Sequence, residues 1–255
     1  MTSGKKENKE QAANLKDLGP KERKKRKAKK RLRRLCWLLA ALAAAIIFLF
    51  LLSHKPSRYN PPEFTHDTLV SPYLTNVLAP AFNNAVQLSE PFDLLVDQNG
   101  INEAIVWYYK CKWSKQFGEI IPSAPQAFFG PNTITLMGTV AAAGREFVVT
   151  VAAEPTLSRA GLLNLNVTKV KVGTVNITPI ARIIAGTIYQ KRLQTRPLNK
   201  DDVRVKIWAS LLDNEPFDPV FKIKDAFQEY RKVRLKKATV RQRELVLRLV
   251  PLPSS

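Results

Sequence analysis

The sequence is poor in the side chains that build metal sites and disulfide-stabilised folds. Its 255 residues include two Cys and two His. Two Cys cannot form a disulfide framework or a four-thiolate zinc site, and two His are too few for a multi-histidine site. Only 10 residues are Gly, which excludes a collagen-like chain. We therefore expect neither a metal nor a cofactor.

Motifs of the common enzyme classes are also lacking. The chain has no G-x-S-x-G, no P-loop, no H-E-x-x-H and no dinucleotide-binding fingerprint. His54 and His66 lie in or just beyond a Pro-containing segment, and neither is placed like a catalytic base. Asp201 and Asp202 are adjacent, so on a strand they would face opposite ways and could not flank one substrate bond. The sequence thus indicates a protein that is not an enzyme.

Positive charge, by contrast, is abundant and unevenly distributed. The net charge is +20, and residues 1–34 carry 15 basic and 4 acidic side chains. Residues 222–248 carry 10 basic and 3 acidic side chains, whereas residues 55–221 are nearly balanced, with 16 and 14. Charge confined to two segments does not indicate a general nucleic-acid-binding surface, so no nucleic-acid partner is expected.

An unbroken run of 18 uncharged residues, most of them apolar, spans residues 35–52. At 1.5 Å per residue, a helix of this length covers about 27 Å, close to the hydrocarbon thickness of a bilayer. A helix is also the only form in which a single segment satisfies its backbone polar groups inside a membrane. The run predicts a transmembrane helix over residues 35–53, with the lipid bilayer as a partner.

The flanking charges predict how this helix is oriented. The basic block of residues 21–34 precedes it, and only Lys55 and Arg58 follow closely. Basic segments stay on the cytoplasmic side, so we expect a single-pass cell-membrane protein with a cytoplasmic N-terminus and an extracytoplasmic C-terminal domain. The basic block should also lie on anionic lipid headgroups. A cleaved signal peptide is the alternative, but its apolar region is usually about 7–15 residues long and ends in small residues.

The chain is accordingly predicted to have four parts. Residues 1–34 form a basic cytoplasmic tail that is partly disordered, and residues 35–53 form the signal anchor. Residues 54–62 form a Pro-containing linker, and residues 63–255 form one extracytoplasmic domain, which is long enough for a sizeable core.

Helices are predicted in the first part of this domain. Ser71 and Pro72 begin one helix, and Pro80 ends or kinks it. A short strand follows at residues 92–96. Asp97 can then cap a second helix over residues 98–110.

The later pattern is the alternation typical of strands. Strands are predicted at residues 134–140 and 147–151, the second ended by Pro155, and a third begins at Leu163. Two slips of apolar parity, the second near Gly173, predict bulges or strong twist. A helix beginning at Thr178 and Pro179 follows, and further strands are predicted at residues 203–211, 220–224, 231–236 and 241–249. Together the elements predict an α+β fold in which a long twisted antiparallel sheet packs around one or two helices.

Several of these segments share a further pattern. Residues 96–105 look like an opening helix, residues 134–155 like a pair of long strands, and residues 170–179 read V-K-V-G-T-V-N-I-T-P before an apolar helix. Together with residues 233–249, they resemble the YpmS-like family of single-pass extracytoplasmic envelope proteins, over roughly residues 94–250 and the N-terminal anchor. The resemblance implies an envelope protein, and its sheet looks like that of the tubular lipid-binding superfamily, in which a sheet curls around a helix and leaves an apolar groove for acyl chains.

If that likeness holds, apolar strand and helix positions line a lipid groove. The candidates are Phe129, Leu136, Phe147, Val149, Val151, Leu163, Leu165, Ile180, Ile184 and Ile188. Alternation alone does not distinguish a lined groove from a filled core, so ordinary core packing is the alternative for each of them.

The basic C-terminal strands supply a second candidate surface. Lys232, Arg234 and Lys236 share one face if residues 231–236 form a strand, and they could meet an anionic partner. A solvated outer face is the alternative. Two hypotheses follow. In the first, the outer domain binds lipid or another amphiphile. In the second, it is a structural or scaffold module that binds a protein or an anionic polymer through these strands.

Overall fold

The computed structural model describes residues 20–61, 70–113, 123–142, 144–181, 183–184, 187, 202–224 and 230–253. The chain divides into two units, Met1–Phe50 and Leu51–Ser255. The tail segment 1–19, which the sequence predicts to be disordered, lies outside the described residues.

Helix α2 (Pro20–Ser53) makes up the described part of the first unit, and its last turn belongs to the second. Its stretch Lys29–Ser53 is the one helix in the described part of the chain that is long and apolar enough to cross a membrane. The predicted helix over residues 35–53 is therefore confirmed. The helix begins earlier than predicted, because the Lys, Arg and Ala of the basic block are themselves good helix formers.

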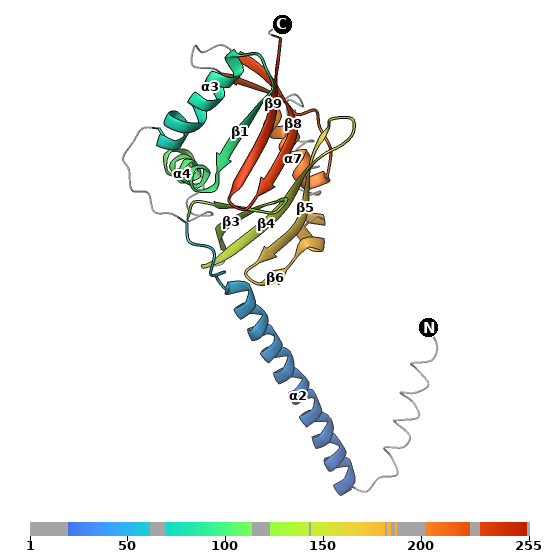
Figure 1. Ribbon diagram of the computed structural model, residues 1–255. Helices are drawn as coiled ribbons and strands as arrows, with labels where there is room; N and C mark the ends of the chain where they lie inside the picture. Colours follow the sequence, from blue (N-terminus) through green and yellow to red (C-terminus); the bar gives the residue numbers. More distant parts are fainter. Residues whose placement is uncertain are drawn as a thin grey trace. The chain divides into compact units, whose positions relative to one another are not determined.

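The strands of the second unit form two antiparallel sheets (Figure 1). The four-stranded sheet has the order β1–β9–β8–β7. Its strands are β1 (Phe92–Asp97), β7 (Val220–Lys224), β8 (Tyr230–Arg241) and β9 (Glu244–Leu252). The five-stranded sheet runs β2 to β6 in sequence order. Its strands are β2 (Gln126–Gly130), β3 (Thr133–Ala142), β4 (Arg145–Leu157), β5 (Leu163–Val172) and β6 (Val175–Asn176).

The α+β class is thus confirmed, but the strands form two sheets where the sequence suggested one long sheet. Alternation shows which residues share a face, and it does not show where a sheet ends. The ladders that define the two sheets join β1 to β9, which lie at opposite ends of the domain sequence.

Two helical segments pack beside β1. The first contains the π-helical segment η1 (Leu74–Leu78) followed directly by α3 (Ala79–Gln87). Pro80 therefore does not end the helix, because it stands in the first turn of α3, where a missing N–H costs little. The second contains α4 (Gln98–Tyr108) and η2 (Tyr109–Trp113), close to the predicted bounds. The predicted cap is confirmed, since the Gly100 N–H donates to Asp97 Oδ2 at 2.9 Å.

A tyrosine fixes these two helical segments to each other. Tyr73 lies against Gly100 so closely that a Cβ on Gly100 would overlap its ring. The Tyr73 hydroxyl also accepts a hydrogen bond of 2.9 Å from the Asp97 N–H. Gly100 is therefore required for close approach, because its own backbone conformation is ordinary for a helix.

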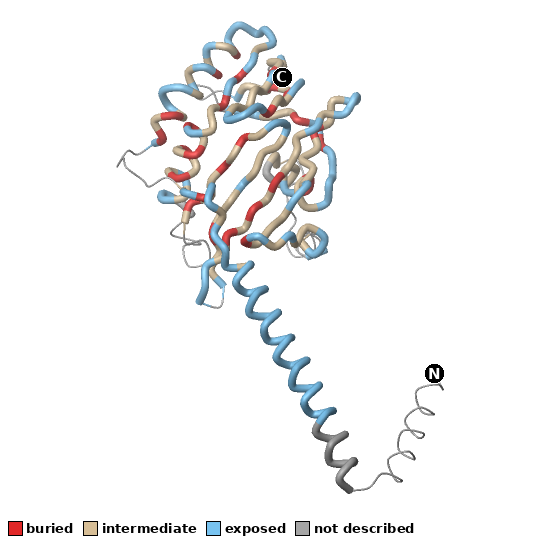
Figure 2. The backbone as a smooth tube through the Cα atoms, turned by 60° about the horizontal axis from the view of Figure 1, so that its bottom comes forward, coloured by how far each residue is buried: buried red, intermediate tan, exposed pale blue. Residues whose placement is uncertain are grey.

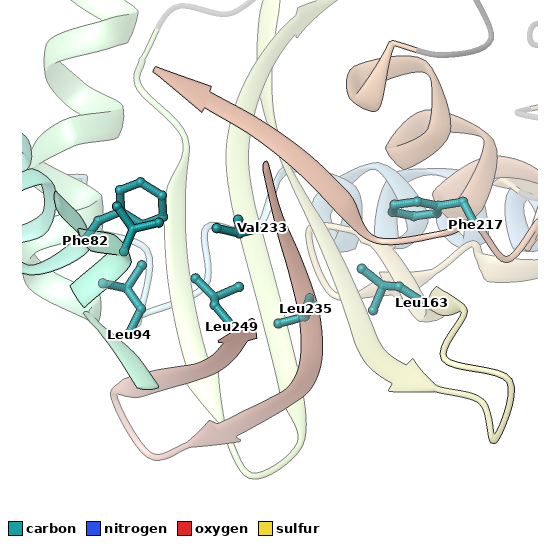
Figure 3. Packing of buried hydrophobic residues seen from close by; sticks show 8 residues of the cluster. Phe82, Leu94, Leu163, Phe217, Val233, Leu235 and Leu249 are labelled. Atoms are coloured by element: carbon teal, nitrogen blue, oxygen red, sulfur yellow. The ribbon is translucent and has the colours of Figure 1, made fainter. Parts of the chain in front are cut away.

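The main core lies between the inner face of the four-stranded sheet, helix α3 and one end of the five-stranded sheet (Figure 3). Its buried members are Phe82, Val86, Leu94, Leu163, Phe217, Val233, Leu235 and Leu249. A smaller cluster of Val96, Phe129 and Val240 continues it toward β2. The alternating residues of β1, β8 and β9 thus bury one face of the four-stranded sheet and leave the other outward.

Strand β8 keeps its apolar residues inward by means of a bulge. Val233 and Leu235 are buried before the bulge, and Ala238 and Val240 pack inward after it. The register skips Lys236, so the parity of the inward positions shifts by one residue. The predicted strand 231–236 therefore continues to Arg241, which sequence alternation alone did not indicate.

Three further sequence expectations need correction. The predicted strand at residues 203–211 is a helix, α7 (Val203–Asp213). Pro155 does not end β4, because β3 pairs only as far as Ala153, and a proline there interrupts no hydrogen bond of that ladder. Gly173 belongs to a tight turn between β5 and β6, with φ of 57°, and not to a bulge. The first predicted slip is confirmed as a register shift between β4 and β5 opposite Ala152 and Ala153.

The sequence does not predict helix α7, because its apolar residues do not follow a clear helical periodicity. Val203, Ile207 and Leu211 are spaced four apart, which suits a helix face, but they are interrupted by residues that also suit a strand. Tertiary contacts in the structure explain why this segment is a helix and not a strand. Ile207 packs on the main core, and the Ser210 hydroxyl accepts a hydrogen bond of 2.8 Å from the Leu165 N–H at the edge of β5.

Candidate functional site

The ten predicted groove residues separate into three groups. Phe129 and Leu163 are buried in the core clusters, and Leu165 packs against the main cluster. For these three residues, ordinary core packing is the correct interpretation. Ile188 lies outside the described residues.

Four of the remaining candidates share one face of the five-stranded sheet. Leu136 pairs with Val151, and Val140 with Phe147, across β3 and β4. Val149 pairs with Val172, and Val151 with Val170, across β4 and β5. We call this set the valine face, and it consists of Leu136, Val140, Phe147, Val149, Val151, Val170 and Val172.

The valine face is only half-buried. Leu136 is 43% exposed, and the other six members are of intermediate burial. No member belongs to the two core clusters or packs against them. These residues therefore form an apolar row across β3, β4 and β5 that is in partial contact with solvent. Figure 2 shows the backbone coloured by the burial of each residue.

The opposite face of the same strands is more deeply buried, although it carries polar side chains. Thr139 and Thr150 are buried there, together with Val148 and Ala152. Soluble sheets ordinarily bury their apolar face and expose their polar one. Around Thr139 and Thr150 this order is locally reversed, because two buried threonines lie behind half-exposed members of the valine face. Toward β2 and the start of β5, the side of the sheet that bears the valine face carries the buried Phe129 and Leu163.

Tyr59 accounts for part of this burial. It belongs to the segment 54–62, predicted to be a linker, yet it is only 3% exposed. Its hydroxyl forms hydrogen bonds with Thr139 Oγ1 at 2.9 Å and Ser123 Oγ at 2.8 Å. The following N–H, that of Asn60, donates to Gln126 Oε1 at 3.1 Å. The linker is therefore held against the polar face of the five-stranded sheet and does not hang free as a stalk.

The valine face ends beside the start of the second unit. Val172 pairs with Val175 around the turn formed by Gly173 and Thr174. The Thr174 N–H donates to the carbonyl oxygen of Leu51 at 3.1 Å. A Cβ on Gly173 would overlap that same oxygen, so glycine is required here for both its φ and the close approach.

The groove candidates Ile180 and Ile184 do not line an interior. Ile180, Ile183 and Ile184 are 59%, 73% and 52% exposed on the short helix that begins at Thr178. The Thr178 hydroxyl accepts a hydrogen bond of 2.8 Å from the Val170 N–H, which fixes the start of the helix to β5.

The predicted anionic-partner residues lie on the outer face of the four-stranded sheet. Lys232 and Arg234 share that face because Val233 between them, and Leu235 after them, are buried. Lys236 is the residue skipped by the bulge and is exposed. Arg234 pairs with Asp218 at 3.3 Å, and both side chains are partly exposed. Lys232 and Arg234 therefore share a face, as the sequence predicts. Lys236 lies at the bulge, where the pairing with β9 skips it.

Among the described residues, no group of three His, Cys, Asp or Glu side chains is placed to hold a metal ion. Burial raises the pKa of the Tyr109 phenol, and repulsion from the Tyr59 phenolate adds to the rise. The raised pKa keeps the Tyr109 phenol protonated, so this side chain does not become a more available base near neutral pH.

Comparisons with protein-family models, curated proteins and solved structures find no match to this chain.

Proposed function

We propose that this chain is a single-pass membrane protein whose second unit binds lipid or another amphiphile on the valine face, without catalysing a reaction. The observation that carries the proposal is the partial exposure of the valine face in the middle of the five-stranded sheet. Thr139 and Thr150 on the opposite face are buried, while all seven members of the valine face remain at least partly exposed. An apolar surface of this kind, contiguous across three strands, is typical of a binding site.

The free energy gained by covering the valine face favours an apolar ligand. Complete burial of a Val, Leu or Phe side chain gains about 1.5–3 kcal/mol, so covering one that is already half-buried gains on the order of 1 kcal/mol. The seven members together offer several kcal/mol to an acyl chain. The Leu, Phe and Val side chains of the valine face carry no polar atom. They therefore offer a polar ligand no hydrogen bond that could replace those it makes to water.

The position of the face supports a ligand taken from the bilayer. If α2 spans the membrane, Leu51 stands where the helix leaves it, and the turn beside Leu51 is the end of the valine face. The positive-inside rule then puts the basic block 21–34 in the cytoplasm, on anionic headgroups, and the second unit on the far side. An acyl chain reaching the face would enter at the β5–β6 turn.

The orientation is tested by protease protection of the full-length chain in sealed right-side-out membrane vesicles. Trypsin should digest the second unit and leave the basic tail intact until the vesicles are opened. Cleavage of the tail in sealed vesicles, with the second unit protected, would reverse the proposed topology.

The ligand is tested by labelling from the lipid side. Full-length protein is reconstituted in nanodiscs containing a phospholipid with a photoreactive group in its acyl chain, and labelled peptides are identified by mass spectrometry. We expect label in β3, β4 and β5 in addition to α2. Label confined to α2 would contradict binding on the valine face and leave the chain a membrane-anchored domain without a lipid site.

A further inference from the structure

Three isoleucines on the short helix that follows β6 are exposed, although their spacing is that of a buried helix face. Ile180, Ile183 and Ile184 stand at i, i+3 and i+4, so they share one face of the helix. All three are exposed, whereas Thr178 and Ala181, on another side of the helix, are half-buried. A stripe of this spacing ordinarily packs on a core. We call these three residues the isoleucine stripe.

Hydrogen bonds fix the first turn of this helix and so the direction of its stripe. The Thr178 hydroxyl donates to Asn176 Oδ1 at 2.6 Å and accepts from the Val170 N–H at 2.8 Å. The Ala181 N–H donates to the Ile177 carbonyl at 2.8 Å, which closes the first helical turn. The helix is therefore held at the edge of β5, and the exposure of its stripe follows from the fold.

The turn that precedes this helix is bonded to the last turn of α2. The carbonyl oxygen of Leu51 accepts hydrogen bonds from the Thr174 N–H at 3.1 Å and from the Thr174 hydroxyl at 3.2 Å. The last four carbonyl groups of a helix have no partner within it, and α2 ends at Ser53. The β5–β6 turn therefore caps the C-terminal end of α2.

This cap brings the isoleucine stripe to the membrane boundary, provided that α2 spans the bilayer. The apolar run of α2 ends at residue 52, so the Leu51 carbonyl would lie at the edge of the hydrocarbon core. The four residues from Thr174 to Thr178 cover at most about 14 Å even when fully extended. The headgroup layer is about 5–8 Å thick on each side of the core. The helix therefore begins within reach of this layer.

We propose that this short helix lies on the surface of the bilayer beside the end of α2, with the isoleucine stripe among the headgroups and the upper acyl carbons. Amphipathic helices at such an interface bury their apolar face by about 5–10 Å. The inference rests on the proposed membrane span of α2, and it does not depend on amphiphile binding at the valine face. The bonds to Leu51 favour the bilayer over a protein partner, because they keep the stripe beside lipid in every copy of the chain.

A second attachment of this kind restricts how the second unit stands on the membrane. The end of α2 and the isoleucine stripe are joined by the β5–β6 turn, so the unit cannot rotate freely about its anchor. The valine face ends at Val172, beside the same turn. The stripe therefore keeps that end of the valine face against the lipid.

The test measures the depth of a nitroxide spin label in full-length protein within phosphatidylcholine nanodiscs. Cys36→Ser and Cys111→Ser first remove the two native thiols. The label is attached at Ile183→Cys, and the control label at Leu88→Cys, whose native side chain is 72% exposed against 73% for Ile183. Leu88 is the last residue of the α3 segment, and Figure 1 shows the end of α3 and the β5–β6 turn at opposite ends of the second unit.

Depth is read from collisions of the label with oxygen, which concentrates in lipid, and with a nickel chelate, which stays in water. The ratio of oxygen to nickel collisions should be several times higher for the Ile183 label than for the Leu88 label. Equal ratios would overturn the inference. A label at Ile183 that is shielded from both agents would also overturn it, because the stripe would then be covered by a protein partner or a second copy of the chain.

A third label separates this inference from the membrane span on which it rests. Ala44→Cys places the label in the middle of the apolar run of α2, where oxygen should reach it and nickel should not. A water-exposed label at Ala44 would refute the span itself. Lipid contact at Ala44 together with water contact at Ile183 would refute the isoleucine stripe alone.

Two pairs of added substitutions test whether the stripe itself holds the helix on the membrane. Ile180→Gln with Ile184→Gln should lower the ratio of the Ile183 label to that of the Leu88 label. The control pair is Val77→Gln with Leu95→Gln, at apolar side chains of similar exposure on η1 and β1, and it should leave the ratio unchanged. Equal responses to the two pairs would show that the isoleucines do not bind the membrane.

Discussion

Asn102 on α4 and Ala127 on β2 exchange two hydrogen bonds through one side chain. The Asn102 amide donates to the Ala127 carbonyl at 2.8 Å and accepts from the Ala127 N–H at 2.6 Å. One turn earlier on the same helix, Gln98 accepts from the Phe129 N–H at 2.8 Å. Residues four apart on a helix are about 6 Å apart, which matches alternate residues of a strand. The free edge of β2 is thereby closed by helix side chains.

This edge predicts a large effect of a single substitution. Asn102→Leu should leave the buried N–H and carbonyl of Ala127 without partners and lower the free energy of unfolding by about 2–4 kcal/mol. The measurement is denaturant unfolding of the full-length chain in detergent. Asn99→Leu, at an exposed position of the same helix, is the control and should change stability little. Equal stability of the two variants would show that β2 does not depend on this side chain.

The comparison of sequence with structure shows where pattern reasoning succeeds. The helix cap at Asp97 and the strand β1 follow from local chemistry that the residues carry themselves. The pairing of β1 with β9 and the burial of Asn102 depend on residues distant in sequence, so no local pattern reveals them. A polar pair four residues apart, Gln98 and Asn102, was the available signal for the closed edge of β2.

The candidate site shows the same limit. Phe147, Val149 and Val151 of β4 are correctly predicted to share one face, because alternation determines faces. Whether a face is covered depends on what packs on it. Leu163 and Leu136 therefore read alike in the sequence, although one is buried and the other 43% exposed.

This difference between the two leucines is directly measurable. Leu163→Ala should lower the free energy of unfolding by about 2–5 kcal/mol, which is the usual range for truncating a buried leucine. Leu136→Ala should cost much less, since its side chain is already partly in water, and it should weaken acyl-chain labelling of β3 and β4. Thermal unfolding of the two variants side by side checks the first point. A larger loss for Leu136→Ala would mean that the valine face is core.

The contact between Tyr73 and Gly100 supplies a third prediction. Gly100→Ala places a methyl group into the Tyr73 ring, so the two helical segments must separate, and we expect a loss of at least about 1–3 kcal/mol. Gly138→Ala is the matched control, because a Cβ there meets only ordinary contacts with Pro125 near 3.8 Å. If Gly138→Ala were the more damaging of the two, the packing of Tyr73 would be misassigned.

The held linker predicts altered protease sensitivity. Tyr59→Phe removes the hydroxyl that bonds Thr139 and Ser123, which should loosen residues 54–61 and speed tryptic cleavage after Lys55 or Arg58. Cleavage rates of folded full-length protein, followed by mass spectrometry, report this directly. Unchanged rates would indicate that the linker is held by other contacts, such as that of Lys55 with the Tyr59 ring.

Photocrosslinking from the protein side tests the central claim most directly. A benzophenone-bearing phenylalanine analogue is placed at Phe147, on the valine face, or at Phe128, on the opposite face of the same sheet, in full-length protein within lipid nanodiscs. Both positions are half-buried phenylalanines, so size and burial are matched. We predict adducts with the mass of an intact phospholipid at Phe147 and few at Phe128. Equal yields at the two positions, or no lipid adduct at Phe147, would contradict an amphiphile site on this face.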